Sequence, residues 1–206
     1  MDRRLLTVKC TLARIQQSKR QLLARPERQA AILRGAAAAF ARSGFAATSM
    51  EDVAAACEVS RLIVYRHFDS KEELYRTILE RVFTRTGEEL EAGLRQPDLR
   101  GVGVRTILTV AREDPDGFVL LWRHAAREPQ FAEYAHDQRE LAVAAVGDLM
   151  ALKSGDETID HWCAESAFGW LVESVLTWLE FGDPARDGEL VDRATAALRA
   201  MRAAWT

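Results

Sequence analysis

Apolar residues recur at intervals of three and four positions over most of the chain, which is the period of an amphipathic α-helix. The first clear segment opens at Pro26 and places Ile32, Ala36 and Phe40 on one face. Gly44 follows this segment, where glycine commonly ends a helix. The pattern therefore predicts a helix from about residue 27 to the glycine.

Hydroxyl residues stand where three further helices would begin. Thr48 and Ser49 precede one short apolar face and Ser60 precedes another, while Ser70 opens a long amphipathic segment. Acidic residues three positions after the first and last of these sites complete capping boxes. Residues 27–69 are thus predicted to form three short helices, the last two joined by a turn of about three residues, as in a helix-turn-helix.

The rest of the chain is also predicted to be helical, with prolines and glycines between the segments. The expected helices lie near residues 99–113, 116–127, 130–153, 157–181 and 185–204. The fold class is therefore all-α. We expect a basic N-terminal arm over residues 1–25, a helix-turn-helix domain over 26–72 and a helical effector-binding and dimerisation domain over 73–206.

Composition indicates a globular protein, with 48% hydrophobic and 29% charged residues among 206. The three cysteines are widely spaced and odd in number, so we expect no disulfide framework and a reducing, cytoplasmic location. No apolar run approaches the roughly 20 residues of a membrane-spanning helix, so no membrane partner is expected. The N-terminus is a poor signal peptide because polar residues interrupt its apolar positions.

Charge divides the chain unevenly. Residues 1–71 contain 13 Lys/Arg and 6 Asp/Glu, a net of +7, and residues 72–206 contain 15 and 25, a net of −10. A basic first third suggests contact with a polyanion, although chance clustering of solvated charges would give the same asymmetry.

The stretch over residues 44–74 reads GFAATSMEDVAAACEVSRLIVYRHFDSKEEL. It resembles the N-terminal domain of the TetR family of transcriptional regulators, in its Gly-aromatic pair, paired hydroxyls, Val-Ser, Tyr-x-His-Phe and Ser-Lys-Glu. The resemblance extends from about residue 27 to residue 74. It implies a DNA-binding regulator, most often a repressor, that acts as a homodimer on a palindromic double-stranded operator and responds to a small-molecule effector.

The resemblance also implies which side chains meet DNA. The expected DNA-binding residues are Thr48, Ser49, Ser60, Arg61, Leu62, Ile63, Tyr65, Arg66, His67 and Lys71. Arg61 would take guanine or a phosphate, hydroxyls would donate to phosphate, and tyrosine, histidine and lysine would clamp the backbone. Core packing with a capping bond is the alternative for Tyr65 and His67, while Val59, Val64 and Phe68 match core positions.

Three positions depart from the family pattern. Leu62 and Ile63 replace the usual glycine and threonine or alanine, and Glu58 replaces a turn glycine. We expect the two apolar side chains to read thymine methyl groups by contact, which leaves hydrogen bonding to Arg61 and its neighbours.

The last two predicted helices carry apolar residues suited to a four-helix interface between two protomers. The expected interface residues are Phe168, Leu171, Val175, Leu179, Leu190, Ala194, Leu198 and Met201. An intramolecular bundle would show the same pattern.

Aromatic residues of the C-terminal region suit a pocket for a small hydrophobic effector. The expected ligand-binding residues are Phe118, Trp122, Trp162, Ser166 and Trp170, although each aromatic side chain taken alone is better explained as core.

Enzymatic and metal-dependent functions find little support. His161, Cys163 and Glu165 are close in sequence, but a zinc site needs further ligands and the chain has only His124 and His136 as other free histidines. There is no HExxH, CxxC, P-loop or nucleophile elbow. We therefore expect no enzyme, no metal and no cofactor. The alternative function is a helical small-molecule-binding protein without sequence-specific DNA binding.

Overall fold

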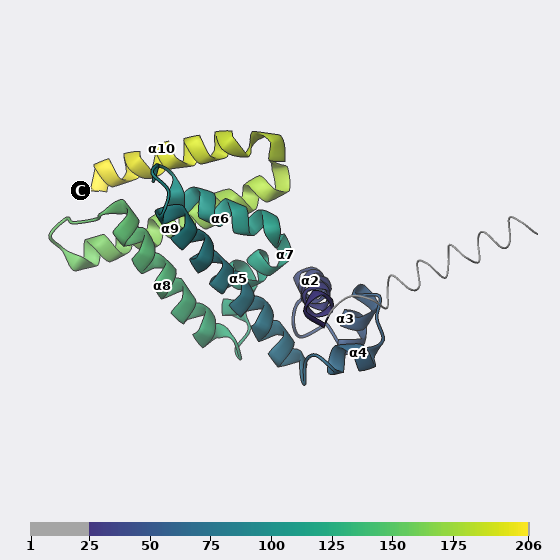
Figure 1. Ribbon diagram of the computed structural model, residues 1–206. Coiled ribbons are helices and arrows are strands. Elements are labelled where there is room, and N and C mark those ends of the chain that lie inside the picture. The colour runs from purple at the N-terminus through teal and green to yellow at the C-terminus, as the bar shows by residue number, and fades with distance from the viewer. Residues whose placement is uncertain (1–24, 206) are drawn as a thin grey trace, which may run out of the picture.

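The computed structural model describes residues 25–205, and over this range it contains helices and no strand, which confirms the all-α class (Figure 1). The predicted N-terminal arm lies outside the described residues except for Arg25. Four helices come first, in an order that agrees with the predicted caps: α2 (Arg25–Ser43), α3 (Met50–Ala56), α4 (Arg61–Tyr65) and α5 (Lys71–Leu94).

The first three of these helices pack into a small bundle. Gly44 ends α2 with a φ of 80°, a left-handed conformation that suits glycine. Ser49 caps α3 in a full capping box with Asp52. Val53, Val64 and Phe40 are almost completely buried between the helices. The bundle is therefore held by local caps and a compact apolar centre.

The C-terminal helices are α6 (Val102–Glu113), α7 (Pro115–Val119), α8 (Ala132–Met150), α9 (Glu157–Phe181) and α10 (Asp187–Trp205). The helix predicted over 116–127 is not uniform, since a π-helical turn (Leu120–His124) and a 3₁₀ turn (Ala125–Arg127) follow α7. Leu120 and Leu121 in the π-helical turn are both buried in the core. A short 3₁₀ turn (Pro184–Arg186) precedes α10.

An aromatic cluster joins the small bundle to the C-terminal helices. The ring of Tyr75 on α5 lies 5.0 Å from that of Phe45 and 4.6 Å from that of Phe131, measured between centroids. Phe45 and Phe131 are also in edge contact, at 5.1 Å. The boundary predicted after residue 72 falls in the first turn of α5, so this helix connects the two regions through a shared core.

No helix within residues 25–205 has the length and apolar character that a bilayer crossing requires.

Candidate nucleic-acid interface

The apolar side of helix α4 packs against the core of the three-helix bundle. Val64 is completely buried, Phe68 beyond the helix is 2% exposed, and Val59 packs partly against the same core. These three core predictions are confirmed. The helix covers residues 61–65, shorter than the predicted 60–67, and Ser60 stands at its N-cap without a side-chain capping bond.

The outward face of α4 carries the residues expected to meet DNA. Leu62 is 71% exposed and Tyr65 is 37% exposed, and both Arg61 and Arg66 are exposed. Ile63 differs from Leu62, because it is half-buried and packs against the core. Of the two neighbouring apolar residues, Leu62 therefore lies on the surface and Ile63 lies partly in the interior.

Arg61 is held by neighbours on two helices. Its guanidinium forms an ion pair with Glu51 of α3 and donates to the Tyr65 hydroxyl at 3.2 Å. It also lies 5.1 Å from the centroid of the Tyr65 ring. The hydrogen bond with Tyr65 raises the pKa of Arg61 above its ordinary value, with Glu51 adding to the effect. Sequence reasoning missed Glu51 because the two partners are ten positions apart on different helices.

Thr48 and Ser49 have local roles in the loop before α3. Thr48 is 2% exposed, and its hydroxyl donates to the Gly44 carbonyl at 2.7 Å. The exposed Ser49 hydroxyl accepts from the Asp52 amide at 3.1 Å. Bonds from Ser49 lower the pKa of the Asp52 carboxyl, which therefore remains charged beside the N-terminus of α3.

Lys71, at the start of α5, binds the main chain of the same loop. Its ammonium group donates to the carbonyls of Phe45 at 2.9 Å and Thr48 at 3.0 Å, and lies 4.2 Å from the Phe45 ring centroid. An ammonium group has three N–H donors, so one remains available for a phosphate. His67 is half-buried beside Phe68, at a centroid distance of 6.4 Å.

The turn between α3 and α4 contains a residue in a conformation that favours glycine. Glu58 has a φ of 53°, in the left-handed region, and therefore adopts the backbone that the replaced turn glycine would take. Cys57 precedes it, with its thiol 3.5 Å from the Ile32 carbonyl oxygen. Burial raises the pKa of Cys57 to about 11, so this thiol stays protonated at neutral pH.

The positive charge of the first third lies mainly outside the described residues. Residues 25–71 contain 7 Lys/Arg and 5 Asp/Glu, a net of +2, and residues 1–24 contain 6 and 1, a net of +5. The helix-turn-helix region thus has only a small net positive charge, and residues 1–24 carry most of the excess.

The residues expected to bind an effector do not gather in one place. Phe118 is completely buried. The ring centroid of Trp122 lies 6.4 Å from that of Phe118 and 5.0 Å from that of Phe168. Trp162 is 54% exposed and contacts Trp205, with centroids 5.4 Å apart. Ser166 and Trp170 are half-buried on α9, and none of the five predicted residues lines the cavity of about 410 Å³ beside α6, α8, α9 and α10.

The residues expected at a dimer interface are partly interior. Phe168, Leu171, Val175 and Ala194 are each at most 3% exposed within a single protomer, as in the alternative of an intramolecular bundle. The other four, Leu179, Leu190, Leu198 and Met201, are half-buried. On α9 and α10, the sides that the protomer core does not cover remain open to a partner.

The described residues hold no group of three or more His, Cys, Asp or Glu placed to bind a metal ion. On α9, Cys163 is buried and His161 is exposed, so the side chains diverge.

Comparison with known sequences places the chain among bacterial regulators. The model of "Bacterial regulatory proteins, tetR family" matches residues 32–78. The HTH-type transcriptional activator FasR of Mycolicibacterium smegmatis is 30% identical over 195 residues, covering 89% of this chain and 84% of that protein. An HTH-type transcriptional repressor of Mycobacterium tuberculosis is 43% identical over 61 residues, 30% of this chain.

Solved structures share the same fold. A TetR-family regulator from Bordetella parapertussis superimposes with a TM-score of 0.72 at 24% identity, covering 85% of this chain and 95% of that one. AibR, in complex with isovaleryl coenzyme A and operator DNA, gives 0.63 at 20% identity, covering 84% and 98%. With a near full-length relative and a matching helix-turn-helix, this chain belongs to the TetR family of transcriptional regulators.

Proposed function

We propose that this regulator binds a palindromic operator as a homodimer, represses transcription there, and is released by a small hydrophobic effector. The observation that carries the proposal is the division of α4 into two sides. Val64 fixes the helix to the core, while Arg61, Leu62 and Tyr65 face outward together. A short helix presented in this way is suited to enter a major groove.

The exposed side chains suggest how bases are read. Arg61 can donate two hydrogen bonds to guanine, and Leu62 can contact a thymine methyl group. Ile63 is half-buried, so the thymine contact is now assigned to Leu62 alone. Thr48 contributes through the fold of its loop, while the third N–H of Lys71 and the hydroxyls of Ser60 and Tyr65 are proposed to hold phosphates. Ser49 is proposed to do the same after its hydroxyl gives up its hydrogen bond to the Asp52 carboxylate at 2.6 Å. Arg66, exposed at the end of α4, is proposed as a further phosphate contact, as is His67.

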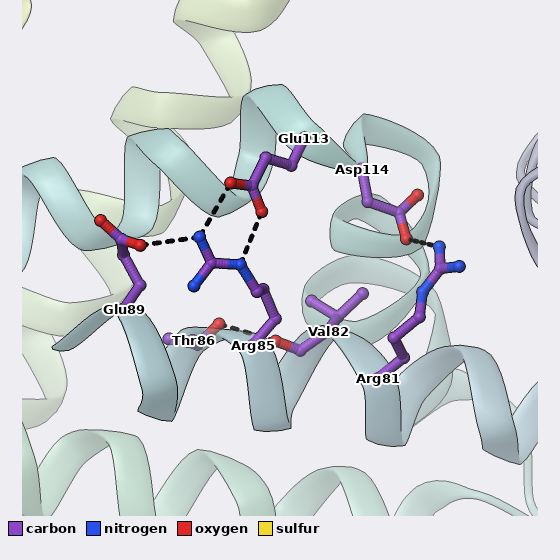
Figure 2. Close-up of polar contacts among 7 residues, drawn as sticks. All are labelled: Arg81, Val82, Arg85, Thr86, Glu89, Glu113 and Asp114. Atoms are coloured by element: carbon purple, nitrogen blue, oxygen red, sulfur yellow. Dashed lines mark hydrogen bonds and ion pairs between the residues drawn. The ribbon is translucent and has the colours of Figure 1, made fainter. Parts of the chain in front are cut away.

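Ion pairs between α5 and the corner of α6 and α7 offer a route from effector to DNA (Figure 2). Arg85 donates to both oxygens of Glu113 at 2.8 Å and to Glu89 at 2.7 Å, and Arg81 pairs with Asp114. These bonds raise the pKa of Arg85. Asp114 also accepts from the Gly117 amide at 3.1 Å and so caps α7.

A displacement of that corner would therefore act on α5, which continues from the helix-turn-helix. The proposed response is a population shift, in which effector favours a spacing of the two α4 helices that fits the operator less well. AibR, a relative in fold, has been seen with both an acyl coenzyme A and operator DNA, which supports the combination of the two sites in one chain.

Dimerisation is proposed because one short helix reads a half-site weakly. Two helices about 34 Å apart reach two half-sites on one face of the duplex. The outer sides of α9 and α10 are the surfaces assigned to the contact.

The predicted effector residues Phe118 and Trp122 remain proposed as a part of the interior that adapts to ligand. The indole N–H of Trp122 is buried without a hydrogen-bond partner among the described residues, so a ligand could accept a hydrogen bond from it.

The test is selection from random DNA with the purified protein at a fixed salt concentration near physiological. Enrichment of a palindrome is expected, and repression of a reporter placed behind that palindrome would distinguish repressor from activator. Weak binding without a motif and with a steep salt dependence would instead favour the helical small-molecule-binding alternative.

A further inference from the structure

One cavity lies at the end of the molecule remote from α4 (Figure 1). It has a volume of about 410 Å³ and is bordered by the end of α5, the start of α6, the ends of α8 and α10, and the middle of α9. This is within the size range of sites that bind small molecules. Its walls are mainly apolar, with Val104, Val146, Met150 and Leu171 among them.

The mouth of the cavity is basic. Three arginines and no acidic residue line the apolar cavity, namely Arg100, Arg199 and Arg202. A neighbouring hollow of about 290 Å³ shares Arg100, Thr195 and Arg199 with it and adds Arg105, Asp98 and Asp192. Four arginines against two aspartates give the two adjoining hollows together a net charge of +2.

The mouth arginines other than Arg199, namely Arg100, Arg105 and Arg202, are engaged within the chain. Arg100 pairs with Asp98 at 3.4 Å, with both side chains exposed, and Arg105 donates to the main-chain carbonyls of Arg100 and Asp98. Within residues 25–205 no carboxylate pairs with Arg199. Arg199 is therefore the cation of this mouth best placed to meet an anion from outside.

Thr195, which lines both hollows, carries a buried hydroxyl. The Oγ1 atom of Thr195 is buried and has no hydrogen-bond partner among the described residues. Gly101 faces it with a φ of 65°, and a β-carbon at this glycine would overlap the hydroxyl oxygen. An unsatisfied buried hydroxyl is unfavourable unless a ligand completes it.

We propose that these two adjoining hollows bind an amphiphile with an unbranched apolar tail and one anionic head group, a carboxylate or a phosphate ester. The tail fills the apolar cavity, and the head accepts hydrogen bonds from Arg199 and from the Thr195 hydroxyl. The binding of such a compound is inferred from the geometry of the two hollows alone. That the same compound is the effector rests on the proposed function.

Calorimetric titration of the intact protein with octanoate, decanoate and laurate, each below its aggregation concentration, tests the site. Affinity should rise about fourfold for each methylene added until the cavity is full. Decanoate should bind about tenfold more tightly than 1-decanol, because the alcohol lacks the charge that strengthens bonds to the head group. Decyl phosphate, compared with decanoate, distinguishes the two kinds of head group.

Substitutions separate the head from the tail. Arg199→Ala should weaken decanoate about tenfold and leave 1-decanol unchanged, and Thr195→Val should act in the same direction. Arg193→Ala is the matched control, since this residue is exposed on the same helix and lines neither hollow. Val146→Phe should abolish binding of both compounds by filling the cavity, and Leu149→Trp does the same from a more exposed position if the first variant fails to fold.

Equal affinity for decanoate and 1-decanol, with no effect of Arg199→Ala, would overturn the anionic head group. Absence of binding by every compound, or binding that survives a cavity-filling variant, would overturn the site. A separate measurement addresses the regulatory role. If decanoate binds as described but the complex with the selected operator persists at saturation, the effector role fails and the site stands; release that requires Arg199 supports both.

Discussion

At the scale of single residues, the guanidinium of Arg61 lies between the carboxylate of Glu51 and the ring of Tyr65. An exposed ion pair of this kind contributes little to stability, because water screens it. It does keep the arginine on the outward face of α4. In the proposed complex DNA would compete with Glu51 for this cation, so the acid would tune operator affinity without touching a base.

Arg61→Ala should therefore weaken binding to the selected operator about 10- to 100-fold. Glu51→Gln should strengthen it by up to about fivefold, since the competing charge is removed. Titration of labelled operator at constant salt measures both. The double variant decides the cause, because a gain from Glu51→Gln that persists without Arg61 would mean direct repulsion of DNA phosphates by the acid.

A second residue-scale prediction concerns Glu58, whose left-handed backbone is strained for any side chain with a β-carbon. Glu58→Gly should raise the free energy of unfolding by about 0.5 kcal/mol, since relief of strain exceeds the entropy that glycine adds to the unfolded chain. Glu58→Ala keeps the strain and serves as the control. Urea midpoints compare them, and equal midpoints would show that the turn tolerates the β-carbon.

At the scale of elements, α10 is attached to the rest of the fold through its first residue. Asp187 accepts hydrogen bonds from Arg112 at 3.0 and 2.7 Å and from the indole nitrogen of Trp178 at 2.7 Å. The carboxylate thereby connects α6, α9 and α10. Bonds from Arg112, and then from Trp178, hold the pKa of Asp187 below its ordinary value.

Asp187→Asn should lower the free energy of unfolding by about 2 kcal/mol at pH 7, because it leaves a partly buried guanidinium without its charged partner. A depressed folded-state pKa stabilises the protein above the unfolded pKa of about 3.9, and this contribution is lost as pH falls through the folded value. Urea unfolding at pH 7 and pH 3 should show the gap between wild type and variant closing at the lower pH. A gap of constant size would assign the effect to packing.

At the scale of the whole molecule, most large apolar side chains of α9 and α10 are covered by the protomer core, but α9 exposes Ile159, Trp162 and Phe181. Phe181, at the end of α9, is the most exposed of the three, at 78%. An aromatic side chain this exposed is more easily explained in an assembly than in an isolated protomer.

Phe181→Asp should convert a dimer into a monomer at micromolar concentration, measured by light scattering coupled to gel filtration. Leu141→Asp is the matched control, because Leu141 is 58% exposed on α8, away from the assigned contact. It should leave the dimer intact. Monomerisation by both variants, or by the control alone, would place the contact elsewhere.

Local patterns in the amino-acid chain were enough for the element order, the all-α class and the core side of the helix-turn-helix. Hydroxyl caps such as Ser49, the glycine after α2 and the apolar spacing act within a few residues, so they can be read directly. The core positions of Val59, Val64 and Phe68 followed instead from the resemblance to the TetR family, and the structure confirms them.

Contacts between distant residues needed the folded chain. Nothing near Arg61 indicates that Glu51 holds it, that Lys71 donates to the loop before α3, or that Phe168 is interior instead of facing a partner. The same is true of Thr195, whose hydroxyl lies beside Gly101 almost a hundred positions earlier. Sequence periodicity indicates which side of a helix is apolar. The packing of the other helices determines which residues cover that side and where a cavity remains.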